Sequence, residues 1–72
     1  MENTLNKDSK PVWMKVKDLT TDHKLQLEDG SWQKIVSIEN GMYFNSKLIH
    51  FKNGEWSNLL KDDKVQAILI SH

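Results

Sequence analysis

The chain has 72 residues, with ten lysines balanced by ten acidic residues, and it contains no arginine and no cysteine. This length predicts one domain, and the lack of cysteine excludes disulfides and thiolate zinc sites, so apolar packing must stabilise the fold. Zero net charge without arginine argues against sequence-specific DNA binding, because arginine is the usual reader of guanine and phosphate. An AT-rich genome, which favours lysine and asparagine, is the alternative explanation for the missing arginine.

No apolar run approaches the ~18 residues of a membrane span, and the N-terminus lacks the charged and apolar regions of a signal peptide. We therefore expect a cytoplasmic protein without a membrane segment. Residues 1–10 are polar and without periodicity, which predicts a disordered arm. Residues 11–72 should form a single β domain, with Pro11 at the start of its first strand.

The first expected strand covers residues 12–17 and alternates between two faces. Val12, Met14 and Val16 form the face that should reach the core, and Trp13, Lys15 and Lys17 form the other. Trp13 then either packs over the end of the domain and a lysine stem or contacts a partner.

Two later segments, residues 24–38 and 47–60, align at an offset of 24 residues. Each reads as a hairpin with a glycine at its turn, Gly30 or Gly54, and a tryptophan two residues later, Trp32 or Trp56. Asp29-Gly30 supplies the two positive-φ positions that a type I′ turn requires. The sequence therefore predicts two hairpins of similar design.

The third expected strand, residues 31–39, has imperfect alternation, because Ile35, Val36 and Ile38 cannot share one face of a flat strand. A bulge near Ile35 would resolve this, and bent strands allow small barrels to close. Asn40-Gly41 predicts another I′ turn, with a strand beginning at residues 42–44. The last strand, residues 65–70, is apolar on both faces, so it is expected to be central or to lie at a subunit interface.

Turn signals recur every 11 to 13 residues, which is typical of a small all-β domain. The prediction is an all-β fold, a meander of five to six mostly antiparallel strands closing into a small barrel.

Catalytic constellations are not evident. The paired carboxylates at residues 28–29 and 62–63 fall in expected turns, where they are more typical of solvated turn formers than of an acid–base pair. His23, His50 and His72 lack zinc-site spacing, and no nucleophile or phosphate-binding motif occurs. We expect a protein that is not an enzyme and that has no cofactor and no metal.

Aromatic residues are the remaining signal. They either cap the ends of the core or form a shallow platform for a peptide or a stacked base. The candidate partner-binding residues are Trp13, Trp32, Tyr43 and Trp56, with Lys15 and Lys17 as rim charges. The leading hypothesis is a protein-interaction module. The alternatives are a weak lysine-based nucleic-acid binder and a structural subunit that assembles through its last strand.

Residues 16–39, VKDLTTDHKLQLEDGSWQKIVSIE, resemble the opening of small SH3-like β-barrels of the KOW type. Those barrels begin with a strand, a short polar turn, a strand that reaches a D-G turn, and a further strand. The chain lacks their usual basic residues and their glycine before the second strand, so the resemblance implies the fold rather than RNA binding. Its size and composition also resemble early accessory proteins of large tailed phages, which implies binding and modulation of a host protein.

Overall fold

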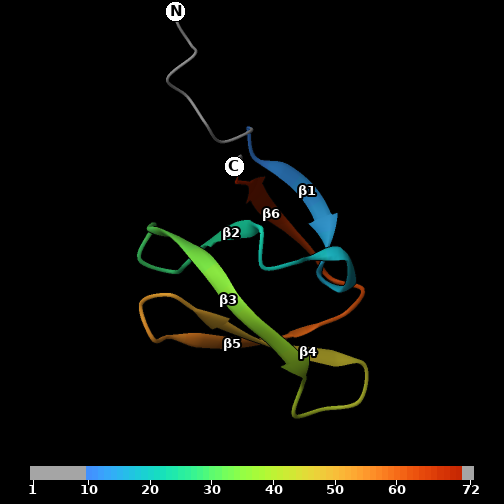
Figure 1. Cartoon of the computed structure of the whole chain (residues 1–72). Coiled ribbons are helices and arrows are strands. Elements are labelled where there is room, and N and C mark those ends of the chain that lie inside the picture. The colour runs from blue at the N-terminus through green and yellow to red at the C-terminus, as the bar shows by residue number, and fades with distance from the viewer. Residues whose placement is uncertain (1–9, 71–72) are drawn as a thin grey trace, which may run out of the picture.

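The computed structural model describes residues 10–70 of the chain (Figure 1). It contains six strands and one short 3₁₀ helix: β1 Val12–Lys15, η2 Val16–Asp18, β2 His23–Gln26, β3 Trp32–Asn40, β4 Ser46–Phe51, β5 Trp56–Leu60 and β6 Lys64–Leu69. The disordered arm expected for residues 1–10 lies, except for Lys10, outside the described residues.

All six strands belong to one sheet with the order β1-β6-β2-β3-β4-β5, and every neighbouring pair is antiparallel. The all-β class and the central position of the last strand are confirmed. Because β6 lies between β1 and β2, neither of its edges is free to pair with another copy. The expected meander holds only from β2 to β5, and the sheet does not close into a barrel, since β1 and β5 remain its two edges.

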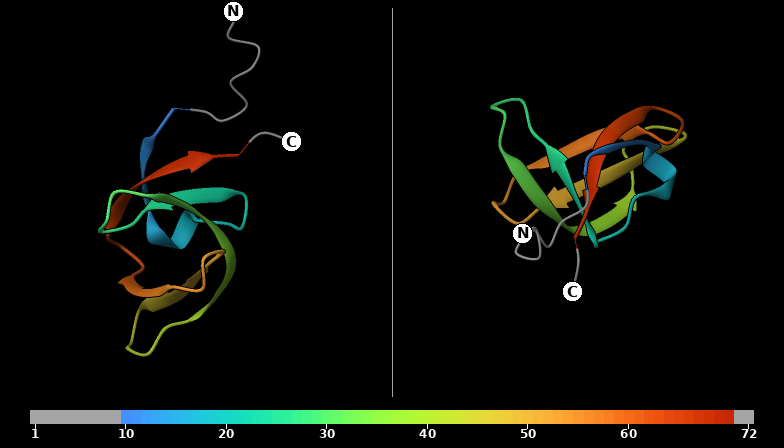
Figure 2. Two further views of the ribbon diagram at one scale, coloured as in Figure 1. Left: turned by 90° about the vertical axis from the view of Figure 1, so that its left-hand side faces the viewer. Right: turned by 90° about the horizontal axis from the view of Figure 1, so that it is seen from above.

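A bend in β3 folds this sheet over on itself (Figure 2). The first half of β3 pairs with β2 and the second half with β4, and the register shifts between Ile35 and Ser37. This is the bulge that the sequence predicted near Ile35. It leaves Ile35 fully buried while Val36 is 48% exposed, because the extra residue resets the alternation of the strand.

The core lies between the two halves of the bent sheet. Its buried apolar residues are Val16, Leu19, Leu25, Ile35, Ile49, Phe51 and Ala67. Met14 packs against this cluster as expected, but the expectation that Val12 is buried was wrong, since it is 54% exposed. Val12 opens an edge strand that pairs on one side only, so no second strand covers it.

The β2–β3 hairpin turns through three residues, not two. The Leu27 amide donates to the Ser31 carbonyl at 2.8 Å, and the Gly30 amide donates to the Leu27 carbonyl at 2.9 Å. Gly30 has a φ of 89°, whereas Asp29 has no positive φ, so the predicted type I′ turn is wrong. The geometry is that of a three-residue loop whose last residue is a glycine with positive φ.

The β4–β5 hairpin repeats this loop in detail. The Phe51 amide donates to the Glu55 carbonyl and the Gly54 amide to the Phe51 carbonyl, both at 2.9 Å, and Gly54 has a φ of 93°. In each loop the residue before the glycine accepts a backbone hydrogen bond: Asp29 from Ser31, and Asn53 from Glu55. The predicted repeat of two similar hairpins is therefore confirmed.

The connection between β3 and β4 differs from the prediction. β3 continues through Asn40, and residues 41–45 form a loop, so the I′ turn at Asn40-Gly41 and the strand at residues 42–44 were wrong. Positive φ occurs at Asn45 instead, at 61°. Side chains of Ser46 and Asn58 accept the hydrogen bonds of the loop amides, which removes the need for a strand partner.

Candidate functional site

The gap between the two edge strands β1 and β5, here called the seam, holds a groove of about 720 Å³. It lies between the half of the sheet that contains β1, β6 and β2 and the half that contains β4 and β5. Its lining residues are Trp13, Leu25, Gln26, Leu27, Glu28, Asp29, Phe51, Glu55, Trp56, Ser57, Leu59, Lys64, Val65 and Gln66.

The floor of the groove is continuous with the core. Leu25 and Phe51 are core residues, and Leu27, Leu59 and Val65 are partly buried and pack against that cluster. Leu27 and Phe51 hold equivalent positions in the two hairpins, immediately before their loops. The repeated hairpin design thus supplies an apolar side chain to the floor from each side of the seam.

Two tryptophans flank this floor from the two edge strands. Trp13 lies in β1 and Trp56 begins β5, and both line the groove. They remain 66% and 56% exposed, although burying an indole ring would be worth several kcal/mol by area alone. Large aromatic side chains left exposed beside an apolar groove are typical of a contact surface.

Acidic residues dominate the charged rim. Glu28, Asp29 and Glu55 come from the tips of the two hairpins, and Lys64 is the single lysine among the residues that line the groove. The backbone amide and then the hydroxyl of Ser31 donate hydrogen bonds to Asp29, at 2.9 and 2.7 Å, and lower the pKa of its carboxyl below the ordinary value of 3.8. Asp29 is therefore ionised at neutral pH, and the rim carries an excess of negative charge.

The other sequence-predicted site residues lie elsewhere. Trp32 is half-buried at the start of β3, opposite Gln26. Tyr43 is 70% exposed in the loop between β3 and β4. Lys15 is half-buried opposite Lys64, and Lys17 is exposed in η2.

Of the four predicted aromatic residues, the structure brings only Trp13 and Trp56 to the same groove. Sequence reasoning missed the acidic rim, because it treated Glu28 and Asp29 as turn formers only. The repeat itself carried the signal, since each aligned turn has an acidic residue adjacent to its glycine: Asp29 before Gly30 and Glu55 after Gly54.

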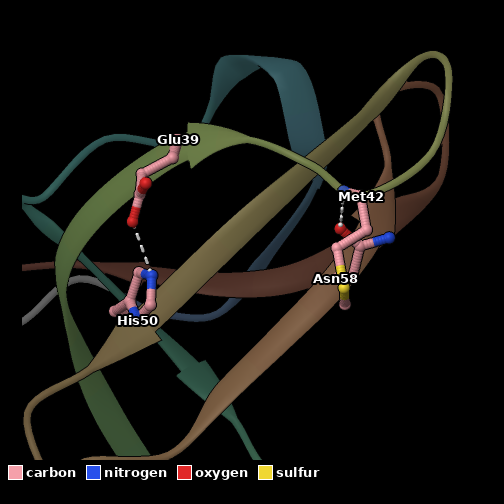
Figure 3. A network of polar contacts seen from close by, with 4 residues as sticks. All are labelled: Glu39, Met42, His50 and Asn58. Atoms are coloured by element: carbon pink, nitrogen blue, oxygen red, sulfur yellow. Dashed lines mark hydrogen bonds and ion pairs between the residues drawn. The ribbon is translucent and has the colours of Figure 1, made fainter.

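A second polar feature lies on the outer face of β3 and β4 (Figure 3). The Nε2 atom of His50 is 2.7 Å from the Oε2 atom of Glu39, with the two side chains 34% and 59% exposed. As predicted, His50 points away from its buried neighbours Ile49 and Phe51. Within residues 10–70, no group of three His, Cys, Asp or Glu side chains is placed to hold a metal ion.

Comparison of the chain with protein-family models, curated proteins and solved structures finds no match. Within the described part of the chain, no helix has the length and apolar character that crossing a bilayer requires. The site is therefore interpreted from its own geometry.

Proposed function

We propose that the protein is a non-catalytic interaction module whose groove binds an extended segment of another protein. The observation that carries this proposal is the placement of Trp13 and Trp56, from opposite edges of the sheet, over one apolar groove. Aromatic anchors beside a desolvated apolar floor are the usual source of binding energy in protein interfaces. An extended segment suits the seam, because the free edges of β1 and β5 can also offer backbone hydrogen bonds.

We further propose that the strands form an SH3-like barrel that is left open at this seam. Two features support this arrangement: the bulged β3 that both halves of the sheet share, and the 3₁₀ turn η2 that connects β1 to the rest of the domain. In such a barrel, the groove is the position where β1 and β5 fail to pair, so a bound segment would complete the wall.

The rim favours a partner segment that contains lysine or arginine. Glu28, Asp29 and Glu55 outnumber Lys64 around the groove, and complementary charge increases both the association rate and the specificity of binding. The same carboxylates would repel a phosphate backbone, so the groove does not support the lysine-based nucleic-acid alternative. The resemblance to accessory proteins of tailed phages makes a cytoplasmic host protein the first partner class to test.

The test is an affinity capture with the tagged full chain from bacterial lysate, with nuclease added to half of each sample. Capture alone does not support the proposal; the loss of the captured protein in the Trp13→Ala and Trp56→Ala variants does. Truncation of an interface hot spot costs about 2 kcal/mol or more, so each variant should weaken binding about 30-fold. Phe44→Ala is the matched control, since it removes an exposed aromatic side chain outside the groove.

Two results would overturn this proposal. The first is a nuclease-resistant partner that binds both tryptophan variants as tightly as the natural chain. The second is a set of captured proteins that disappears on nuclease treatment, which would favour the nucleic-acid alternative and direct mutagenesis to Lys15 and Lys17.

A further inference from the structure

The loop between β3 and β4 presents three consecutive large apolar side chains to solvent. Met42 is 58% exposed, Tyr43 70% and Phe44 97%. None of them is among the residues that line the groove at the seam. Covering a phenylalanine side chain gains roughly 1.5–3 kcal/mol, so an almost fully exposed Phe44 indicates a surface that a partner covers.

Polar contacts hold the first part of this loop in a fixed shape. The Met42 amide donates to the Asn58 Oδ1 atom at 2.9 Å, as drawn in Figure 3. The Tyr43 amide donates to the Ser46 Oγ atom at 3.1 Å, and the Ser46 hydroxyl donates to the Tyr43 carbonyl at 2.7 Å. Ser46 itself is only 3% exposed.

The last part of the loop is anchored to the connection between β5 and β6. The Lys61 amide donates to the Asn45 carbonyl at 2.9 Å, and the Asn45 side-chain amide donates to Asp62 at 3.3 Å. Phe44 is therefore presented from a loop held on both sides, and binding through it costs little additional ordering entropy.

A small apolar hollow lies beside this loop. It has a volume of about 160 Å³ and is lined by Met42, Leu48, His50 and Trp56. His50 and Trp56 are paired across β4 and β5. The hollow is shallow and open to solvent, and its lining offers an apolar surface against which a phenyl ring can pack. The chain's own Phe44 does not fill it, since that side chain is 97% exposed.

The protruding ring and the hollow are close neighbours on one surface. Met42 forms part of the hollow and is two residues from Phe44, which limits the distance between their Cα atoms to about 7 Å. A projection next to a hollow is compatible with a twofold-symmetric interface, because one surface then serves both partners.

We propose that two copies of this chain form a symmetric dimer in which Phe44 of each copy occupies the hollow of the other. Three aromatic side chains per copy, Tyr43, Phe44 and Trp56, would contribute on the order of 1,000 Å² of buried surface. This is just below the lower limit of about 1,200 Å² for specific interfaces, so we expect a weak, reversible dimer whose mass depends on concentration.

The charges around this surface favour a second copy over a lipid bilayer. Glu39 pairs with Leu48 of the hollow, and Asp62 and Lys61 contact Asn45 of the loop, so the charged neighbours of this surface include both signs and form no cationic collar. Peripheral membrane binding instead relies on a cationic collar around the inserted apolar side chains.

The first experiment is sedimentation equilibrium of the full chain from about 1 μM to 1 mM. The fitted mass should rise from 8.4 kDa toward twice that value and no further. Phe44→Ala should weaken the dimer about 30-fold, as loss of a hot-spot contact of about 2 kcal/mol implies. Trp13→Ala, the matched control in the groove, should dimerise like the natural chain.

A mixed sample of isotope-labelled and unlabelled chains tests the contact directly. Intermolecular nuclear Overhauser effects should connect the Phe44 ring with Leu48 and Trp56. Leu48→Phe, which fills the hollow and leaves Phe44 intact, should also abolish dimerisation while circular dichroism confirms folding.

A constant monomer mass, larger assemblies, or a Phe44→Ala variant that dimerises normally would each overturn the proposal. A lipid surface would be the better occupant if the chain stays monomeric and sediments with vesicles of phosphatidylcholine and phosphatidylserine, while Phe44→Ala does not. Trp56 lines both the groove and the hollow, so its substitution does not separate the two proposals. Trp13, which is outside the hollow, and Phe44, which is outside the groove, do separate them: loss of partner binding in Trp13→Ala tests the seam alone, and loss of dimerisation in Phe44→Ala tests the dimer alone.

Discussion

Replacement of Gly41 by alanine should destabilise the domain because of crowding rather than backbone conformation. The φ of Gly41 is outside the left-handed region, but a Cβ atom there would lie 2.7 Å from the carbonyl carbon of Ser46 and 2.5 Å from the Asn58 Oδ1 atom, and it would also collide with the Ser46 hydroxyl. The carbonyl carbon belongs to the backbone of β4, so it cannot rotate away. The two side-chain atoms are acceptors for the amides of the loop that carries Phe44.

The cost follows from these contacts. Forcing a methyl group into a packed site costs about 1–3 kcal/mol, and loss of the Met42 and Tyr43 amide bonds adds about 1 kcal/mol each. We therefore expect Gly41→Ala to lower the free energy of unfolding by at least about 3 kcal/mol, the lower end of this sum. For a domain of this size, that corresponds to a decrease in Tm of about 12–24 °C.

Urea unfolding followed by tryptophan fluorescence measures this change, with Gly54→Ala as the matched control. Gly54 has open space around its Cβ position but a φ of 93°, so alanine there should cost only about 1–2 kcal/mol of backbone strain. If Gly41→Ala is no more destabilising than Gly54→Ala, the steric argument for the loop is wrong.

Two further predictions concern the bulge and the first hairpin. Ile35→Ala should lower the free energy of unfolding by about 2–5 kcal/mol, because the Ile35 side chain is fully buried. Val36→Ala should change it by about 0.5 kcal/mol or less. Urea unfolding that shows similar losses at both positions would contradict the bulge. The pKa of Asp29 measured by NMR titration should lie below 3.8, and Ser31→Ala, which removes one of its two donors, should raise it. Because the folded-state pKa is lowered, the stability that this carboxylate contributes is present above pH 3.8 and is lost as the pH falls through the folded-state pKa. If the NMR titration midpoint of Asp29 is the same in Ser31→Ala as in the natural chain, the role assigned to the Ser31 hydroxyl is wrong.

Features that depend on neighbouring residues were predictable from the sequence. The alternation of Ile35, Val36 and Ile38 required a bulge, and the bulge is present. The repeat around Gly30 and Gly54 predicted two similar hairpins, and both form with the same hydrogen bonds. These features are local because strand alternation and positive φ are properties of a few residues.

Errors arose where a distant side chain or strand decides the outcome. Asp29-Gly30 suits both two- and three-residue loops, and the register of β2 against β3, which places Leu27 opposite Ser31, selects the longer one. Residues 42–44 have high β-propensity, yet Asn58, a residue of β5, accepts the hydrogen bond of the Met42 amide and keeps the segment in a loop.

The sequence by itself determined the class of the protein: one small antiparallel β domain with two matched hairpins, whose core depends on apolar packing. The tertiary structure alone decided which residues meet. Trp13 and Trp56 are far apart in the sequence, and nothing in their spacing places them over one groove. They meet because β6 inserts between β1 and β2 while the bulged β3 turns β4 and β5 back toward them, and such long-range pairing is selected by burial of the whole core rather than by any local pattern.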